Sequence, residues 1–175
     1  MERYDAVGIP VGALGDDDYR YLYAAGKILG IQKITYEIWS YFQGGNTSEN
    51  VAALPAFAVY NDEKGLKEII NEMARNGLII PESRVTDFIP LRSGVGAGYQ
   101  ENGTYLIFKD RPHHVSQLPY LYWLFSDGRY SVEEITKRLQ SLDLEVTDQD
   151  AKEAVLLLLS ESVLFLSLEA QQEWL

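Results

Sequence analysis

The sequence predicts an α+β protein in which one small unit occurs twice. The first observation is a repeat: residues 36–51 correspond to residues 120–135 at a constant offset of 84, so that Trp39 aligns with Trp123. The second is that each copy begins with strand-like segments and ends with apolar residues at helical spacing. A repeat of this kind decides the domain organisation. We therefore expect two units, 1–84 and 85–175, each a small antiparallel sheet plus three helices.

The first copy is expected to begin with a hairpin. Aromatic residues at every second position of 19–23 predict a strand. A tight turn at 25–27 and a second short strand at 28–31 follow. Together these segments predict the sheet of the first unit.

Helices are expected in the remainder of the first copy. Apolar residues of 33–42 recur at helical spacing. Thr47 is a favourable N-cap for a second helix, which Pro55 limits to about two turns. Asn61 or Asp62 then caps a third helix with a single apolar stripe.

The second copy repeats this order with clearer signals. Residues 104–108 predict a strand, and residues 113–115 continue the sheet. A helix is expected at 118–125, with its proline in the first turn, where proline is permitted. The sheet again precedes the helices.

The last two helices of the second copy also have sequence signals. Ser131 and Glu134 form an S-x-x-E capping box, which predicts the start of a helix. Residues 147–150 begin the final helix, and its segment 155–159 is apolar on every side. A helix with this pattern is buried on more than one face. Three helices with a small antiparallel sheet predict a winged-helix-type unit.

Composition and charge exclude several kinds of site. The chain has no Cys, which excludes disulfides and thiol nucleophiles and is consistent with a cytoplasmic protein. The formal net charge is −11 and the Lys and Arg residues are scattered, which argues against nucleic-acid binding. No signal peptide is predicted, because no apolar segment follows a basic start. The apolar stretch 154–168 is interrupted and too short to cross a membrane.

No catalytic, metal or cofactor site is predicted. Gly94, Gly96 and Gly98 precede a strand, whereas a dinucleotide-binding glycine loop precedes a helix. His113 and His114 are the only histidines, and neighbours in a strand point to opposite faces, so they cannot readily bind one ion together. No Ser, His and Asp residues form a recognisable catalytic motif. We therefore expect a protein without enzymatic activity or a cofactor.

The second copy resembles PqqD-like domains, the recognition elements for precursor peptides of ribosomally made, modified peptides. The resemblance rests on the strand, the W-x-x-x-D-G turn at 123–128, the capped helix and the closing apolar helix, and it covers about residues 95–167. Through the repeat it extends to about residues 11–80. The first copy departs from the pattern, because Gln43 precedes Gly44 in place of Asp, and Pro55 shortens its second helix.

The resemblance implies a tandem of winged-helix units that bind peptides. Such domains bind a leader peptide as an added strand on the sheet edge, against the third helix, and have no catalysis of their own. A peptide that adds a strand pairs with a free edge and places alternate side chains in pockets. In the second copy we expect the edge to be His113, His114, Val115 and Ser116, and the pocket wall to be Val155, Leu158 and Leu159.

The predicted function is therefore non-catalytic. The chain is expected to recognise a precursor (leader) peptide and to present it to a peptide-modifying enzyme in natural-product biosynthesis. The second copy is expected to be the better binder, because it keeps Asp127 and Gly128. One alternative is a tandem winged-helix scaffold or regulatory subunit of a larger complex, and another is the N-terminal recognition part of a larger modifying enzyme. The apolar final helix is also compatible with packing between the copies or with a homodimer.

Overall fold

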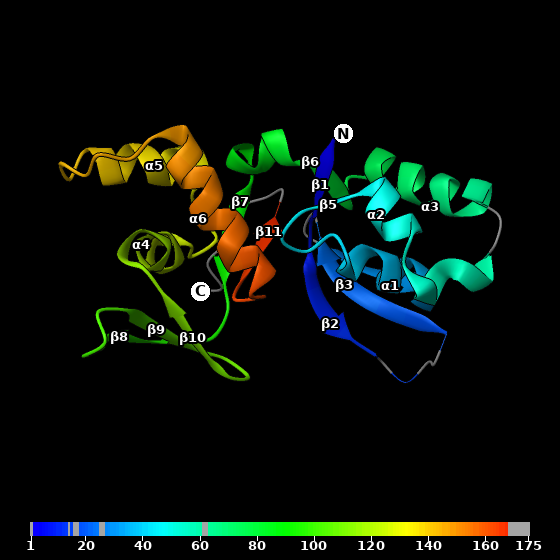
Figure 1. The fold of residues 1–175 in the computed structure, drawn as a ribbon, viewed down its shortest axis with the longest axis horizontal. Coiled ribbons are helices and arrows are strands. Elements are labelled where there is room, and N and C mark those ends of the chain that lie inside the picture. The colour runs from blue at the N-terminus through cyan, green and yellow to red at the C-terminus, as the bar shows by residue number, and fades with distance from the viewer. Residues whose placement is uncertain (1, 14, 16–17, 25–26, 61–62, 168–175) are drawn as a thin grey trace. The chain divides into compact units, whose positions relative to one another are not determined.

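The fold is known from a computed structural model, which describes residues 2–13, 15, 18–24, 27–60 and 63–167 (Figure 1). It is an α+β fold with several small antiparallel sheets. The chain divides into two compact units, Met1–Ser83 and Arg84–Leu175. Two predicted features, the tight turn at 25–27 and the cap at Asn61 or Asp62, depend on residues outside the described ones.

The first unit contains two three-stranded sheets and three α-helices among its described residues. One sheet has the order β2-β3-β4 and the other the order β5-β1-β6. The elements are β1 (Arg3–Ala6), β2 (Ile9–Gly12), β3 (Tyr19–Ala24), β4 (Lys27–Gln32), α1 (Lys33–Ser40), β5 (Asn46–Thr47), α2 (Ser48–Ala52), the 3-10 helix η1 (Pro55–Tyr60), α3 (Glu63–Arg75) and β6 (Ile79–Pro81).

After the 3-10 helix η2 (Glu82–Asp87), the described part of the second unit follows the same order without counterparts of β5 and η1. One sheet has the order β10-β9-β8, and a second sheet joins β11 to β7. The elements are β7 (Ile89–Arg92), β8 (Val95–Tyr99), β9 (Tyr105–Phe108), β10 (Pro112–Val115), α4 (Gln117–Phe125), α5 (Val132–Gln140), α6 (Asp148–Ser160) and β11 (Leu164–Ser167).

The two units share details of strand register. In the first, β2 is irregular between Pro10 and Gly12, and in the second β8 is irregular between Gly96 and Gly98. The hairpins that follow pair in the same way, with Leu22 opposite Leu29 and Ile107 opposite His113. After the last helix the chain returns to the first strand in both units, pairing Ala6 with Ile79 and Arg92 with Leu164. Equivalent positions therefore differ in number by 84 to 86 residues.

The aligned tryptophans make equivalent hydrogen bonds. Trp39 of α1 donates its indole N–H to the carbonyl of Val7 at 3.0 Å. Trp123 of α4 donates to the carbonyl of Ser93 at 3.1 Å. Both indoles are buried, so the hydrogen bond satisfies a polar group that would otherwise lower stability. Each unit thus fixes its first long helix to the backbone between its first two strands.

The helix caps follow the sequence signals. Thr47 accepts a hydrogen bond from the backbone N–H of Asn50, which begins α2. Ser131 and Glu134 form the predicted capping box of α5, since both reciprocal hydrogen bonds are present. The last helices also end alike, because Gly77 (φ 70°) and Ser162 (φ 55°) both adopt the left-handed conformation. No helix in the described part of the chain is long and apolar enough to span a membrane.

Asp5, in the middle of β1, is a buried carboxyl group. Neither of its oxygens has a hydrogen-bond partner among the described residues. Burial, together with the nearby carboxylate of Glu82, raises the pKa of Asp5 from 3.8 to about 7. The amides of Gly44 and Gly45 and the charge of Arg3 oppose this shift, although neither amide reaches hydrogen-bonding geometry. The folded protein therefore retains a proton that the unfolded chain releases in weak acid.

This carboxyl group should make stability fall as the pH rises. Because the folded pKa of Asp5 is raised, its contribution is fully present below about pH 4 and is lost as the pH rises through about 7. The difference from 3.8 corresponds to on the order of 4 kcal/mol. Asp5→Asn should remove this pH dependence. So should Asp5→Leu, which installs the residue found at the equivalent position, Leu91.

Urea unfolding of wild type and both variants between about pH 4 and pH 8 measures this effect. The variants should gain stability relative to wild type as the pH rises. If the free energies of unfolding of wild type and variants differ by the same amount at every pH in that range, Asp5 is ionised in the folded protein.

Candidate functional site

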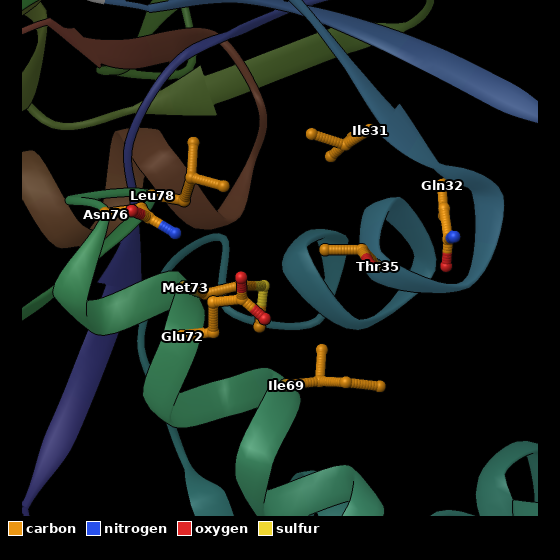
Figure 2. A pocket seen from close by; sticks show the side chains of 8 residues that line it. All are labelled: Ile31, Gln32, Thr35, Ile69, Glu72, Met73, Asn76 and Leu78. Atoms are coloured by element: carbon orange, nitrogen blue, oxygen red, sulfur yellow. The ribbon is translucent and has the colours of Figure 1, made fainter.

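The first unit has a groove between the end of β4 and the helix α3. Its volume is about 340 Å³. Figure 2 shows side chains from the β4–α1 junction on one side and from α3 on the other, facing a common space. The groove is lined by Ile31, Gln32, Thr35, Ile69, Glu72, Met73, Asn76 and Leu78.

The local fold explains why these side chains meet. The strand β4 ends at Gln32 and α1 begins at the next residue, which brings Thr35 close to the end of the strand. Opposite them, the positions 69, 72 and 73 share one face of α3, and position 76, directly after the helix, continues the spacing i, i+3, i+4 and i+7. At the end of α3 the left-handed Gly77 turns the chain, and Leu78 donates its backbone N–H to the carbonyl of Met73.

The groove has an apolar floor and a polar rim. Met73 and Leu78 are buried, and Ile31 and Ile69 are half-buried. Gln32, Glu72 and Asn76 are exposed, and Thr35 is half-buried. An apolar concavity with a few polar groups at its border is the usual form of a ligand site.

The strand beside this groove is an edge strand. In the order β2-β3-β4, β4 has a described neighbour only on the β3 side. Every second residue of such a strand directs its N–H and C=O groups away from its partner, so these groups are free to pair with an added strand. Gly30 lies in the middle of this edge and packs beneath the ring of Tyr21, where a Cβ atom would come within 3.2 Å. At Gly30 the edge of β4 therefore has no side chain that would cover its backbone, and this edge lies next to an apolar groove.

The structure distributes the predicted edge residues of the second unit between two faces. The strand β10 is an edge strand in the order β10-β9-β8. His113 and Val115 are buried, whereas His114 and Ser116 are exposed. The exposed ring of His114 lies 3.0 Å from the Thr104 hydroxyl. An added strand therefore has access to the backbone of β10 and to the outer face.

The predicted pocket wall on α6 needs correction. Val155, Leu158 and Leu159 are buried, so they belong to the interior and do not form an open wall. The exposed apolar residue of this helix segment is Leu157, at 42% exposure. A helix that is apolar on all sides gives no periodic signal for its free face, which explains the error. A charge at Val155 would therefore test folding and not binding.

In the second unit, ion pairs tie β10 to the end of α6. His113 Nδ1 lies 2.7 Å from Glu161 Oε2, and Arg111 Nη2 donates to the same oxygen at 3.0 Å. Lys109 donates to the carbonyl of Ser162 at 2.7 Å. We call Arg111, His113 and Glu161 the clamp. Its counterparts in the first unit are Lys27, Leu29 and Asn76, which cannot form the same ion pairs.

In the second unit, the positions equivalent to the apolar residues of the groove, Ile31, Ile69, Met73 and Leu78, are all buried. They are Val115, Ala154, Leu158 and Val163. The open groove therefore lies in the first unit, whereas the sequence favoured the second.

The glycines at 94–98 have a structural explanation. A Cβ atom on Gly96 would lie 2.6 Å from the Tyr120 hydroxyl and 2.7 Å from the Trp123 ring. Gly94 has a φ of 91°, and a Cβ there would meet the Phe108 carbonyl at 2.7 Å. Gly96 therefore lets β8 pass close to α4, and Gly94 lets the chain turn close to the end of β9, as expected for a glycine turn before a hairpin. Among the described residues, no group of three or more His, Asp or Glu side chains could hold a metal ion.

Sequence reasoning missed the polar residues of the groove. Gln32, Thr35, Glu72 and Asn76 come from segments distant in the sequence, and no motif links them. A signal was nevertheless available in the repeat. At the position of Glu72 the second unit has the apolar Leu157, so the two copies differ where a ligand would lie.

The clamp generates a prediction about coupling. Glu161→Ala should lower stability by about 1–3 kcal/mol, because it leaves the buried His113 ring without its partner. The double variant His113→Leu, Glu161→Ala should recover much of this loss, since removing both partners leaves no buried polar group unsatisfied. Urea unfolding of the two single variants and the double variant measures the coupling energy. If the losses of stability in the two single variants add up to the loss in the double variant, the contact between His113 and Glu161 contributes no coupling energy.

Comparison with family models, with curated proteins and with solved structures finds no match to this chain. The resemblance to PqqD-like domains therefore rests on the residues of the chain itself. Its functional implications stand as a proposal.

Proposed function

We propose that this chain is a non-catalytic peptide-binding module with two PqqD-like, winged-helix-type units. It recognises a precursor (leader) peptide and presents it to a peptide-modifying enzyme. The single observation that carries this proposal is the free edge of β4 beside the groove against α3. An added strand obtains main-chain hydrogen bonds from the edge and side-chain selectivity from the groove.

The arrangement of each unit supports the winged-helix description. A three-stranded antiparallel sheet precedes three α-helices, and the chain then returns to pair with its first strand. The edge strand of the sheet, β4 or β10, leads directly into the first long helix. This order is the one that the resemblance implies.

The first unit is the proposed binding unit. Ile31 and Ile69 of its groove are half-buried, whereas their counterparts in the second unit are buried. Its edge includes Gly30, which has no side chain, and among its described residues nothing equivalent to the clamp crosses from the strand to α3. In the second unit the clamp joins the strand to the helix, and the equivalent side chains are buried. The second unit, in which these positions are buried, then contributes stability or a surface for the partner enzyme.

Selection from a display library of short random peptides tests this function. The purified full chain should enrich peptides that bind as extended strands. Thr35→Trp should weaken binding of an enriched peptide by about tenfold or more, because the indole occupies the space that the peptide side chain needs. Fluorescence anisotropy with the labelled peptide measures the affinity. Glu37→Trp, on an exposed position of the same helix, is the matched control and should bind normally.

Two outcomes contradict the proposal. If no peptide is enriched, the scaffold or regulatory role in a larger complex becomes the better interpretation. If Thr35→Trp binds as well as wild type while remaining folded by circular dichroism, peptides bind elsewhere on the chain.

A further inference from the structure

We infer that the groove of the first unit selects peptides in which a Lys or Arg side chain lies two residues from an apolar side chain. This inference rests on the proposed function and names the class of peptide that the groove takes. The observations that carry it are the apolar floor of the groove and the carboxylate of Glu72 on its border.

Glu72 is the only ionisable residue among the described residues that line the groove. The other polar lining residues, Gln32, Thr35 and Asn76, are neutral. No ion pair to the Glu72 side chain is found within the part of the chain that the structure describes. Arg75, on the same helix, donates instead to the backbone carbonyl of Asn71. A cation from a ligand therefore meets a carboxylate that no described basic residue neutralises.

The dimensions of the groove set the spacing of the peptide side chains. From Ile69 to Asn76 the helix rises by about 10 Å, which matches about three residues of extended chain. Side chains that face the same way along a strand are two residues apart. The groove therefore has room for one apolar side chain over Met73 and Leu78 and for a second side chain near Glu72. Because that second position offers a carboxylate, Lys or Arg is favoured there.

The charge of the chain acts in the same direction. The formal net charge is −11, so long-range attraction also favours basic peptides and disfavours acidic ones. At the border of an exposed groove, one ion pair changes affinity by up to about fivefold. Reversal of the charge replaces attraction by repulsion, so a larger change of about fivefold to tenfold is expected.

The repeat provides a matched control for this residue. The position equivalent to Glu72 is Leu157, which is exposed on α6. A leucine is therefore tolerated at this place in the same helix. Glu72→Leu removes the charge and is expected to leave the fold intact, whereas Glu72→Lys reverses the charge.

The same random-peptide library is selected against wild type, Glu72→Leu and Glu72→Lys. Wild type should enrich Lys or Arg two residues from an apolar residue, and Glu72→Lys should enrich Asp or Glu at that position. Glu72→Leu should keep the apolar preference and lose the preference for a basic residue at that position, so that only the general attraction of the negative chain for basic peptides remains. For one enriched peptide, replacing its basic residue by Glu should weaken binding to wild type by about fivefold to tenfold and restore binding to Glu72→Lys.

The outcomes separate this inference from the proposed function. Identical enrichment by the three proteins, with binding still lost in Thr35→Trp, would overturn the basic-apolar preference and leave the peptide site in place. Enrichment by none of them would overturn both. A selected peptide whose affinity for wild type falls more steeply with added salt than its affinity for Glu72→Leu would support the ion pair directly.

Discussion

Each unit depends on one junction where a single backbone residue holds two helices. In the first unit, Val7 accepts the indole hydrogen bond of Trp39 and donates its own N–H to the carbonyl of Leu78, just after α3. In the second unit, Ser93 accepts from Trp123 and donates to Val163 in the same way. The residue between the first two strands therefore fixes the first helix and the end of the last helix together. Because the groove lies between the β4–α1 connection and α3, this junction helps to set the position of its walls.

Much of the fold could be predicted because its signals are local. The capping box at Ser131 and Glu134 is confirmed, as is the N-cap Thr47, since each depends on residues a few positions apart. The repeat adds a second kind of signal, because it aligns the elements of one unit with those of the other. The free face of α6 could not be predicted, because an apolar helix without periodicity does not indicate its orientation. For this reason the buried Val155, Leu158 and Leu159 were wrongly predicted to line a binding surface.

The two copies differ at the clamp and at the groove. The second unit has the stronger sequence motif, and it also has the clamp, which depends on residues about 50 positions apart. Sequence spacing gives no information about such a contact. The first unit lacks the clamp residues and keeps polar residues around an open groove. A weaker motif is therefore compatible with an open groove, because the turn and the capped helix of the motif contribute no residue to the groove lining.

The proposed function requires that a peptide adds to the edge of β4 and not to the edge of β10. Hydrogen–deuterium exchange of the full chain, with and without a library-selected peptide, tests it most directly, because added main-chain hydrogen bonds slow amide exchange. Peptide binding at β4 should slow exchange in Lys27–Gln32 and in α3 and leave exchange in Pro112–Val115 unchanged. Protection of Pro112–Val115 with no change in Lys27–Gln32 would contradict it and assign binding to the second unit.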